Sequence, residues 1–304
     1  MKLFLIAVCA AAIGSSVVAA QPVSPPLPTS RLDLIAGGAR TTFWRSDAAP
    51  AIWTSAPLAS LVKWTRAADG VETGELLVSG TGEAWRTRVV LVRLAVKQLS
   101  FSLDTASTKR GRPAWSVSRA PRDAVFAVNA GQFRTILPWG QVVLNGREWL
   151  PAEHGPLAMT FVVDSARAVH WVFDGGAIPA HVAWAFQSYP VMLRAREVSA
   201  ALRAADRGID VAHRDARLAL GQYADGSLVV ALTRFDGLGK TLAAVPFGLT
   251  VPEMAAVMGA LDVQDAVLLD GGISAQLVAG RDAQRIQLKG WRDVPIGLVA
   301  IRRQ

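Results

Sequence analysis

Cysteine is almost absent from the sequence: the only one, Cys9, lies in an apolar N-terminal segment. Lys2, the apolar run Leu3–Ile13 and the small residues Val18-Ala19-Ala20 are typical of a secretory leader, and they predict cleavage after Ala20. This leader is too short to span a membrane, and no stop-transfer pattern follows it. The mature chain would then contain no thiol, which excludes a disulfide framework, a cysteine metal site and a cysteine nucleophile. We expect a periplasmic or secreted protein with no membrane span after cleavage.

Lysine is scarce as well. The sequence has 32 Lys and Arg residues, and removal of Lys2 with the leader leaves 31. With 24 Asp and Glu residues and neutral histidines, the net charge of the mature chain is +7. Only five of the 31 basic residues are lysine. The arginine guanidinium can bind phosphate or carboxylate groups through two hydrogen bonds, which would explain an excess of arginine over lysine. Codon bias produces the same excess. Because export argues against nucleic acid, we expect a phosphorylated or otherwise anionic envelope carbohydrate as the partner.

The sequence divides into three parts: a leader at 1–20, a linker with an N-terminal appendage at 21–61, and one domain at 62–304. Prolines concentrated in residues 21–30 predict an extended linker. In the domain, apolar runs bounded by turn residues predict many strands, among them Arg86–Val96, Ala124–Val128 and Val182–Tyr189.

Helices are predicted in few places. Arg194–Ala205 has a helical composition, and Val251–Leu261 has the clearest helical pattern, with Thr250 and Glu253 forming a capping box. We therefore predict the α+β fold class: a central, mostly antiparallel or mixed β-sheet system with a few flanking helices.

The stretch Ala266–Leu277 is the strongest candidate for a functional element. Its first four residues are apolar and predict a strand buried on both faces, which stops at the carboxylate Asp270. Gly271 and Gly272 have no Cβ, so backbone N–H groups can turn toward an anion, and Ser274 adds a hydroxyl. The alternative is a plain Asp-Gly hairpin turn.

Three further apolar runs border on polar residues, which gives four such elements together with the Asp270 stretch. Taken in sequence order, these four elements resemble the phosphodiester glycosidase domain family, in particular bacterial exported relatives of N-acetylglucosamine-1-phosphodiester alpha-N-acetylglucosaminidase. The resemblance covers Val62 to Ile301, and two positions depart from it, since Tyr189 and Ile273 each replace a glycine. The elements and the family patterns that they are similar to are Asn129-Ala130-Gly131-Gln132-Phe133 (Asn-x-Gly-x-Phe), Gln187-Ser188-Tyr189-Pro190 (Gln-Ser-Gly-Pro), Arg217-Leu218-Ala219-Leu220-Gly221 (Arg-x-x-x-Gly) and Asp270-Gly271-Gly272-Ile273-Ser274 (Asp-Gly-Gly-x-Ser).

This resemblance implies a hydrolase that cleaves a sugar-phosphodiester bond without a cofactor. Such cleavage needs a carboxylate near the anomeric carbon and donors for the phosphate oxygens. The catalytic residues would be Asp270 as the carboxylate, Arg217 as the phosphate fork, and Asn129. The substrate-binding residues would be Gly131, Gln187, Ser188, Gly271, Gly272 and Ser274.

Structural roles for the same residues stay open. Asn129 can cap a strand, Gln187 can satisfy a buried backbone group, and Arg217 can be a surface strand residue. A second carboxylate is not resolved by the sequence, and the histidines lack metal-ligand spacing, so no metal site is expected. The carboxylate candidates are Glu148, Glu153 and Asp215, and the histidines are His154, His170, His181 and His213.

Two rival functions come from other classes: a non-catalytic periplasmic module that binds anionic glycan, and a scaffold of a polysaccharide export system. A functional site predicts that Asn129, Gln187, Arg217, Asp270 and Ser274 converge, because core strands of one sheet system can bring their ends to a common edge. Plain turns have no reason to gather there.

Overall fold

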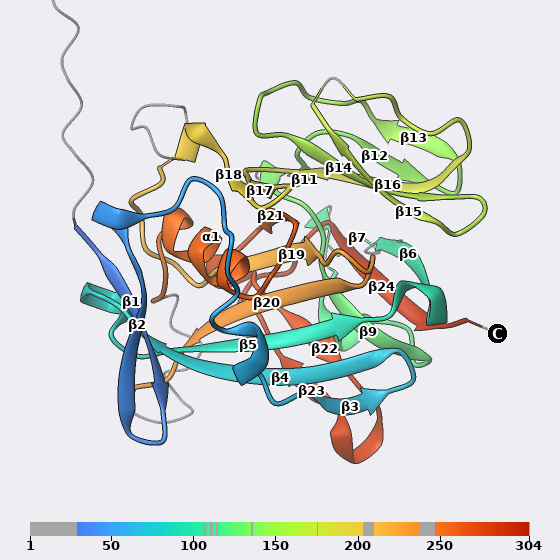
Figure 1. Cartoon of the computed structure of the whole chain (residues 1–304). Coiled ribbons are helices and arrows are strands. Elements are labelled where there is room, and N and C mark those ends of the chain that lie inside the picture. Colours follow the sequence, from blue (N-terminus) through green and yellow to red (C-terminus); the bar gives the residue numbers. More distant parts are fainter. Residues whose placement is uncertain are drawn as a thin grey trace, which may run out of the picture.

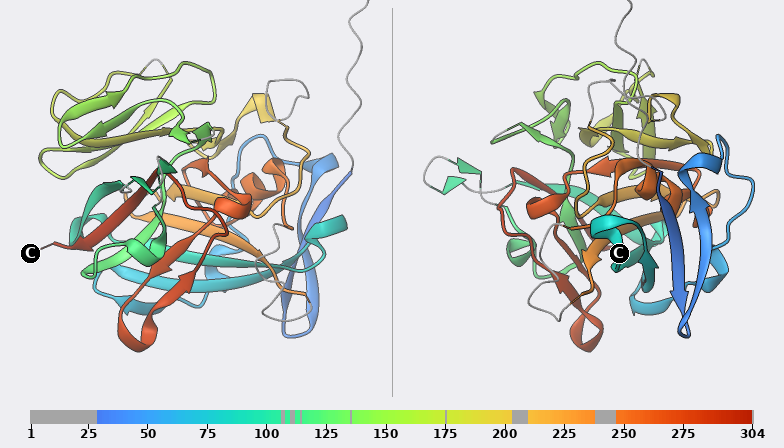
Figure 2. Two further views of the ribbon diagram at one scale, coloured as in Figure 1. Left: turned by 180° about the vertical axis from the view of Figure 1, so that it is seen from behind. Right: turned by 90° about the vertical axis from the view of Figure 1, so that its left-hand side faces the viewer.

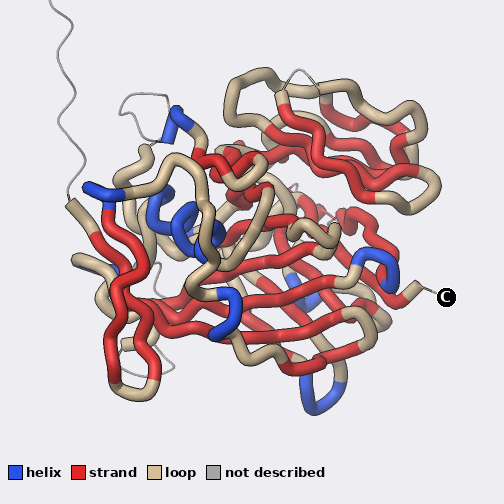
Figure 3. The backbone as a smooth tube through the Cα atoms, viewed as in Figure 1, coloured by secondary structure: helices blue, strands red, loops and turns tan. Residues whose placement is uncertain are grey.

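The computed structural model describes residues 29–303, apart from 106–107, 110–111, 114, 135, 175, 203–209 and 238–246. The expected leader and residues 21–28 of the expected linker lie outside the described residues. In the described part the chain consists mainly of strands (Figures 1 and 3), and the strand pairs are antiparallel, which confirms the predicted mostly antiparallel sheet system. The one α-helix there is α1 (Val251–Ala260). The fold is therefore more β-rich than the expected α+β class.

The first sheet has ten strands in the order β18-β17-β21-β19-β20-β5-β4-β1-β2, with β3 paired to β4. Residues 31–45, which the sequence placed in an appendage, supply β1 and β2 at one edge of this sheet. The strands are β1 (Arg31–Ala36), β2 (Ala39–Arg45), β3 (Thr65–Ala68), β4 (Val71–Ser79), β5 (Thr87–Leu94), β17 (Val191–Arg194), β18 (Glu197–Val198), β19 (Leu218–Gln222), β20 (Leu228–Phe235) and β21 (Asp265–Leu269).

Two five-stranded sheets complete the architecture. The second sheet has the order β23-β22-β9-β24-β6, so β24, the last strand of the sequence, lies between β9 and β6. The third sheet has the order β13-β12-β16-β14-β15 and forms a separate layer in both Figure 1 and Figure 2. The strands are β6 (Leu99–Thr105), β9 (Ala124–Asn129), β22 (Leu277–Ala279), β23 (Ile286–Leu288) and β24 (Ile296–Arg302), then β12 (Val142–Leu144), β13 (Arg147–Leu150), β14 (Met159–Asp164), β15 (Val169–Phe173) and β16 (Val182–Ser188); the short pairs are β7 (Thr108–Lys109) with β8 (Arg112–Pro113), and β10 (Phe133–Arg134) with β11 (Leu137–Pro138).

Both faces of the first sheet are covered. On β20, Val229 and Ala231 belong to the core shared with α1, whereas Leu228, Val230 and Leu232 belong to the core shared with the other two sheets. Side chains of a strand alternate between the two faces of its sheet, so a strand covered on both sides is apolar at every position. The same reasoning explains the unbroken apolar run that ends at Asp270.

Helix α1 confirms the predicted helix and its capping box. The Thr250 hydroxyl accepts a hydrogen bond from the Glu253 N–H (3.3 Å), and the Glu253 carboxylate accepts one from the Thr250 N–H (2.9 Å). The fully buried Glu253 also pairs with both terminal nitrogens of Arg214 (2.5 and 2.8 Å), which ties the helix to the segment before β19. No helix of the described residues is long and apolar enough to cross a membrane.

The helix predicted at Arg194–Ala205 is wrong over its described part, because residues 194–202 form the end of β17, strand β18 and a short 3-10 turn; residues 203–205 lie outside the described residues. Ala195 and Arg196 have positive φ (49° and 67°) and make a tight turn between the two strands. The Arg196 guanidinium donates to the carbonyl of Trp53 (2.6 Å) and pairs with Asp262. These long-range contacts outweigh the helical propensity of the segment.

Candidate functional site

The ends of four strands meet around Asp270. Leu269 of β21 pairs with Leu218 of β19, so the residues just beyond each strand lie next to one another. The Asp270 N–H donates to the carbonyl of Gly131, two residues beyond the end of β9 (2.8 Å), and the Ser188 hydroxyl at the end of β16 donates to the Leu268 carbonyl. The segments that carry the predicted residues are therefore adjacent in space.

The two glycines of the Asp-Gly-Gly loop lie in close contact with the segment before β19, Gly271 with its backbone and Gly272 with a side chain. A Cβ on Gly271 would lie 2.4 Å from the Ala216 carbonyl oxygen, and one on Gly272 would lie 2.6 Å from a carboxylate oxygen of Asp215. Gly272 also has a positive φ of 56°, a backbone conformation that favours glycine. Its N–H donates to the Ala216 carbonyl (2.7 Å). The Gly272 N–H is therefore used within the protein in this structure, and its role toward an anion stays a prediction.

The carboxyl group of Asp270 has a raised pKa. Burial raises this pKa from 3.8 to about 6, although a hydrogen bond from Ser274 and the positive charge of Arg292 act in the opposite direction. The negative charge of Asp215 raises the pKa further. Asp270 thus changes its protonation near neutral pH, as a general acid or base should.

Asp215 is the second carboxylate that the structure brings to this loop. Burial raises its pKa, and the charge of Arg217 partly offsets that effect. Of the other two candidates, Glu148 bonds to Gln141 in the third sheet (3.0 Å) and Glu153 pairs with Arg134 (3.3 Å). The acidic pair at the strand ends is therefore Asp215 and Asp270.

Asn129 holds the Asp270 loop at both ends. Its amide nitrogen donates to the Asp270 carbonyl (2.8 Å), and its amide oxygen accepts from the Gln276 N–H (3.0 Å). The side chain is completely buried. Its described polar contacts are therefore with backbone, as in the structural alternative considered for this residue, and they fix the position of the loop.

Gly131, Gln187 and Ser188 also support the backbone. The Gln187 amide oxygen accepts from the N–H groups of Gln141 (3.0 Å) and Glu153 (2.9 Å), and its amide nitrogen donates to the Glu153 carbonyl (2.8 Å). A Cβ on Gly131 would lie 2.8 Å from the Gln187 carbonyl oxygen. These contacts join β16 to its neighbours, and a role of Gln187 and Ser188 in substrate binding stays a prediction.

Arg217 lies close to the acidic pair, but its guanidinium is largely engaged. Nε donates to the Leu249 carbonyl (2.8 Å), and one terminal nitrogen donates to the His213 carbonyl. Burial lowers its pKa, while the charge of Asp215 opposes that effect. These two bonds fix the orientation of Arg217, and its role as a phosphate fork stays a prediction.

Arg292 is a further candidate for the site, and no motif in the sequence pointed to it. It is exposed, and its charge acts on Asp270. The N–H groups of Trp291 and Arg292 both donate to the Ile273 carbonyl (2.7 and 3.1 Å), which brings this loop against the Asp-Gly-Gly turn. Trp291 is 62% exposed and Ile273 43% exposed. No local pattern distinguishes this arginine, because its position depends on a contact between two loops that are distant in sequence.

The described residues contain no group of three or more His, Cys, Asp or Glu side chains placed to hold a metal ion. The chemistry that the arrangement itself offers is that of two carboxylates with raised pKa, Asp215 and Asp270, beside an exposed cation, Arg292.

Residues 122–301, more than half of the 304 residues, match the model of the phosphodiester glycosidase family. No curated protein matches the sequence.

Solved structures with a similar fold include a hypothetical protein from Synechocystis (14% identity, TM-score 0.52, covering 80% of this chain and 64% of that one). The catalytic domain of zebrafish N-acetylglucosamine-1-phosphodiester alpha-N-acetylglucosaminidase, auto-inhibited by its pro-peptide, is also similar (14%, 0.57, 80% and 88%). A third is a Burkholderia pseudomallei protein named as a candidate exported protein (15%, 0.50, 74% and 76%). This chain thus spans just under two thirds of the Synechocystis protein. At these identities the likeness concerns the fold.

Proposed function

Since this chain belongs to the phosphodiester glycosidase family, we propose that it hydrolyses the bond between a sugar and a phosphodiester in a phosphorylated or anionic envelope carbohydrate. The observation that carries the proposal is the acidic pair Asp215 and Asp270, whose pKa values are both raised, at a loop faced by Arg292. Perturbed carboxylates of this kind concentrate at catalytic sites.

In the proposed reaction, water adds to the anomeric carbon and loses a proton to the Asp270 carboxylate. The bond between the anomeric carbon and the phosphate oxygen breaks, and its electron pair leaves with the phosphate monoester. A pKa of about 6 suits Asp270 to accept a proton at neutral pH. Because phosphate leaves readily, the reaction places little demand on a strong general acid.

Other residues have supporting roles in this proposal. Arg292 binds the phosphate oxygens, because it is exposed and its charge reaches Asp270. Arg217 acts indirectly: it holds the carbonyls of His213 and Leu249 and balances the charge of Asp215. The backbone N–H of Gly271 and the hydroxyl of Ser274 lie in the same loop and complete the polar surroundings of Asp270.

The test is hydrolysis of a methyl phosphodiester of N-acetylglucosamine 1-phosphate, followed by the release of reducing sugar. Asp270→Asn should lower kcat/KM by about 100-fold or more, a typical effect of removing a general base. Asp123→Asn is the matched control, because Asp123 is exposed and precedes the opposite end of β9 from Asn129. Equal turnover by wild type and Asp270→Asn would refute the role of Asp270.

The rival proposal is a module that binds anionic glycan without turnover. It is favoured by Ile273, whose exposed side chain occupies the middle of the Asp-Gly-Gly-x-Ser loop, and by Tyr189, whose ring packs edge-on against Trp139 (4.4 Å between centroids). Retention of the glycan with no new reducing ends after prolonged incubation would favour this module over the hydrolase.

Export is part of the proposal. It is supported by the leader pattern of residues 1–20 and by the similar protein named as a candidate exported protein. Sequencing the N-terminus of the protein recovered from its native compartment should give Gln21 as the first residue. Recovery of the chain with its leader intact, in the cytoplasm, would contradict this part.

A further inference from the structure

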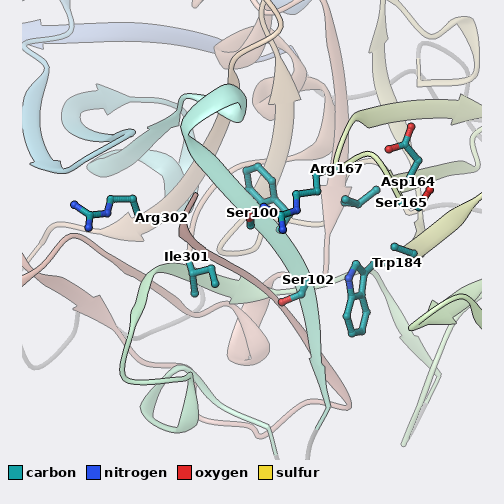
Figure 4. A pocket seen from close by; sticks show the side chains of 11 residues that line it. Ser100, Ser102, Asp164, Ser165, Arg167, Trp184, Ile301 and Arg302 are labelled. Atoms are coloured by element: carbon teal, nitrogen blue, oxygen red, sulfur yellow. The ribbon is translucent and has the colours of Figure 1, made fainter. Parts of the chain in front are cut away.

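A cavity of about 470 Å³ lies between the second and third sheets, away from Asp270. One wall comes from β6 and β24, and the other comes from β16 and the turn between β14 and β15; Figure 4 shows the side chains that line it. Ile296, at one end of β24, accepts a hydrogen bond from the residue after Asn129, whereas Ile301 and Arg302 at the other end line the cavity. Ile296 and Ile301 are five residue steps apart on the strand, which corresponds to about 17 Å.

A second cavity, of about 530 Å³, shares Arg167 with the first. It is lined by Lys97, Gln98 and Arg303 on one side and by the turn between β19 and β20 on the other. The two cavities are therefore neighbours on either side of Arg167, and we call the pair the Arg167 groove. Each half has the volume of a typical small-ligand site.

The charge of the groove is mainly positive. Its carboxylates are already engaged, because Asp164 accepts from the Ala168 N–H and pairs with His170 (2.8 Å each), and Asp225 pairs with Arg93 (2.8 Å). Arg167 has no carboxylate partner among the described residues, and the same holds for Lys97. Their charges are thus available to an anion.

Arg303 lines the second cavity and is bonded to the turn that carries Arg167. One of its terminal nitrogens donates to the Arg167 carbonyl (3.1 Å), while Nε is buried without a partner among the described residues. Nε of Arg303 is closed to solvent and faces the protein, so the part of Arg303 that a ligand could meet is the rest of its guanidinium, which lines the second cavity.

The other half of the groove combines one aromatic face with hydroxyl groups. Trp184 and Ser102 lie together in Figure 4, and Arg167 extends toward Ser100 on β6. Ser165 adds a third hydroxyl. The C–H face of a sugar ring packs on an indole, and serine hydroxyls both donate to and accept from sugar hydroxyls. Arg167 lies between the two cavities, where its guanidinium can bind an acid group carried by the sugar.

We propose that the Arg167 groove binds an acidic oligosaccharide at a site separate from Asp270. One sugar ring lies on Trp184 with its hydroxyls at Ser100 and Ser102, and its acid group bonds to Arg167. The chain continues toward Lys97 and Arg303. This site does not depend on the proposed hydrolysis, and it would hold an acidic polymer on the protein whether or not Asp270 cleaves it.

The test uses tetragalacturonate as the acidic probe and maltotetraose as the neutral one, in isothermal titration calorimetry with the mature protein. Arg167→Gln should weaken the binding of tetragalacturonate about tenfold, and Trp184→Ala should weaken it at least as much. Matched controls are Arg147→Gln, at the exposed hairpin end of β13, and Trp149→Ala, on the same strand with 45% exposure; both should bind within about twofold of wild type. Raising the salt concentration should weaken binding.

Asp270→Asn should bind tetragalacturonate like wild type, and Arg167→Gln should hydrolyse the small phosphodiester like wild type, so the two sites can fail independently. Arg167 lies in an exposed turn, so its replacement tests the groove even if Trp184→Ala does not fold. The proposal is overturned if wild type binds tetragalacturonate no better than maltotetraose, or if Arg167→Gln binds as wild type does. Equal affinity for hexa-aspartate would overturn the assignment to a sugar.

Discussion

Asp270→Asn is expected to increase the free energy of unfolding at neutral pH, although it removes the carboxylate on which the proposed chemistry depends. The pKa of Asp270 is about 6 in the folded protein and 3.8 in its ordinary state. Between these values the folded state holds a proton that the unfolded chain has released. The stability due to this proton is fully present below pH 4 and is lost as the pH rises through 6.

The size of the effect follows from the pKa values. Each unit by which a pKa rises corresponds to about 1.4 kcal/mol, so a rise from 3.8 to about 6 sets an upper limit of about 3 kcal/mol on the loss. Asp270 keeps some contact with water, which reduces the expected value to about 2 kcal/mol. Asn has nearly the same size, has no charge to bury, and can still accept the hydrogen bond from Ser274.

Urea unfolding of wild type, Asp270→Asn and the control Asp123→Asn at several pH values between 4 and 8 measures this effect. The free energies of unfolding of wild type and Asp270→Asn should separate progressively above pH 4 and differ by about 2 kcal/mol at pH 8. The loss of the Asp270 charge also removes its repulsion of the Asp215 carboxylate, which acts in the same direction and adds to the stability of Asp270→Asn. A gap that does not change with pH, or a less stable Asp270→Asn at pH 8, would refute the reasoning.

Three further outcomes are expected. Asp215→Asn removes a negative charge and lowers the pKa of Asp270, so the fall of kcat/KM at acidic pH should move to lower pH; an unmoved profile contradicts the coupling. Gly272→Ala places a methyl group 2.6 Å from a carboxylate oxygen of Asp215 and should reduce kcat/KM much more than Gly226→Ala, which has a similar positive φ and nothing within 4 Å of the added carbon. Asn129→Asp leaves the carbonyl of Asp270 without its donor and should lower the free energy of unfolding at pH 7 by about 1–3 kcal/mol, measured in urea; no loss would mean that the amide is dispensable.

Local patterns predicted much of the secondary structure. The run before Asp270 and the segment Val182–Tyr189 became β21 and β16 because a covered strand needs apolar residues at each position. The Thr250–Glu253 capping box marked the start of α1 because both of its hydrogen bonds are local. The helix expected from Arg194 failed because contacts from distant segments fix the turn at Ala195 and Arg196.

The site was less accessible to sequence reasoning, because its contacts join distant segments. The Asp-Gly-Gly motif located the loop, but only the fold shows that the amide of Asn129 is bonded to that loop on both sides. Arg217 was an obvious cation in the sequence, whereas Arg292 became a candidate only when its loop was found against Ile273. Which of these residues act in catalysis stays a prediction for the assays above.

The position of β24 has a consequence for the order of events during synthesis. Ribosomes release a chain from its N-terminus, so β6 and β9 emerge long before β24, the strand that must later fit between them. Until then both strands have open edges, which are prone to pair with other chains. The surroundings of the Asp270 loop are also incomplete at this stage. Asn129, which bonds to that loop, lies at the end of β9, and β9 still lacks its neighbour β24. The nascent protein is therefore expected to be inactive and to need protection from aggregation until its last strand is available.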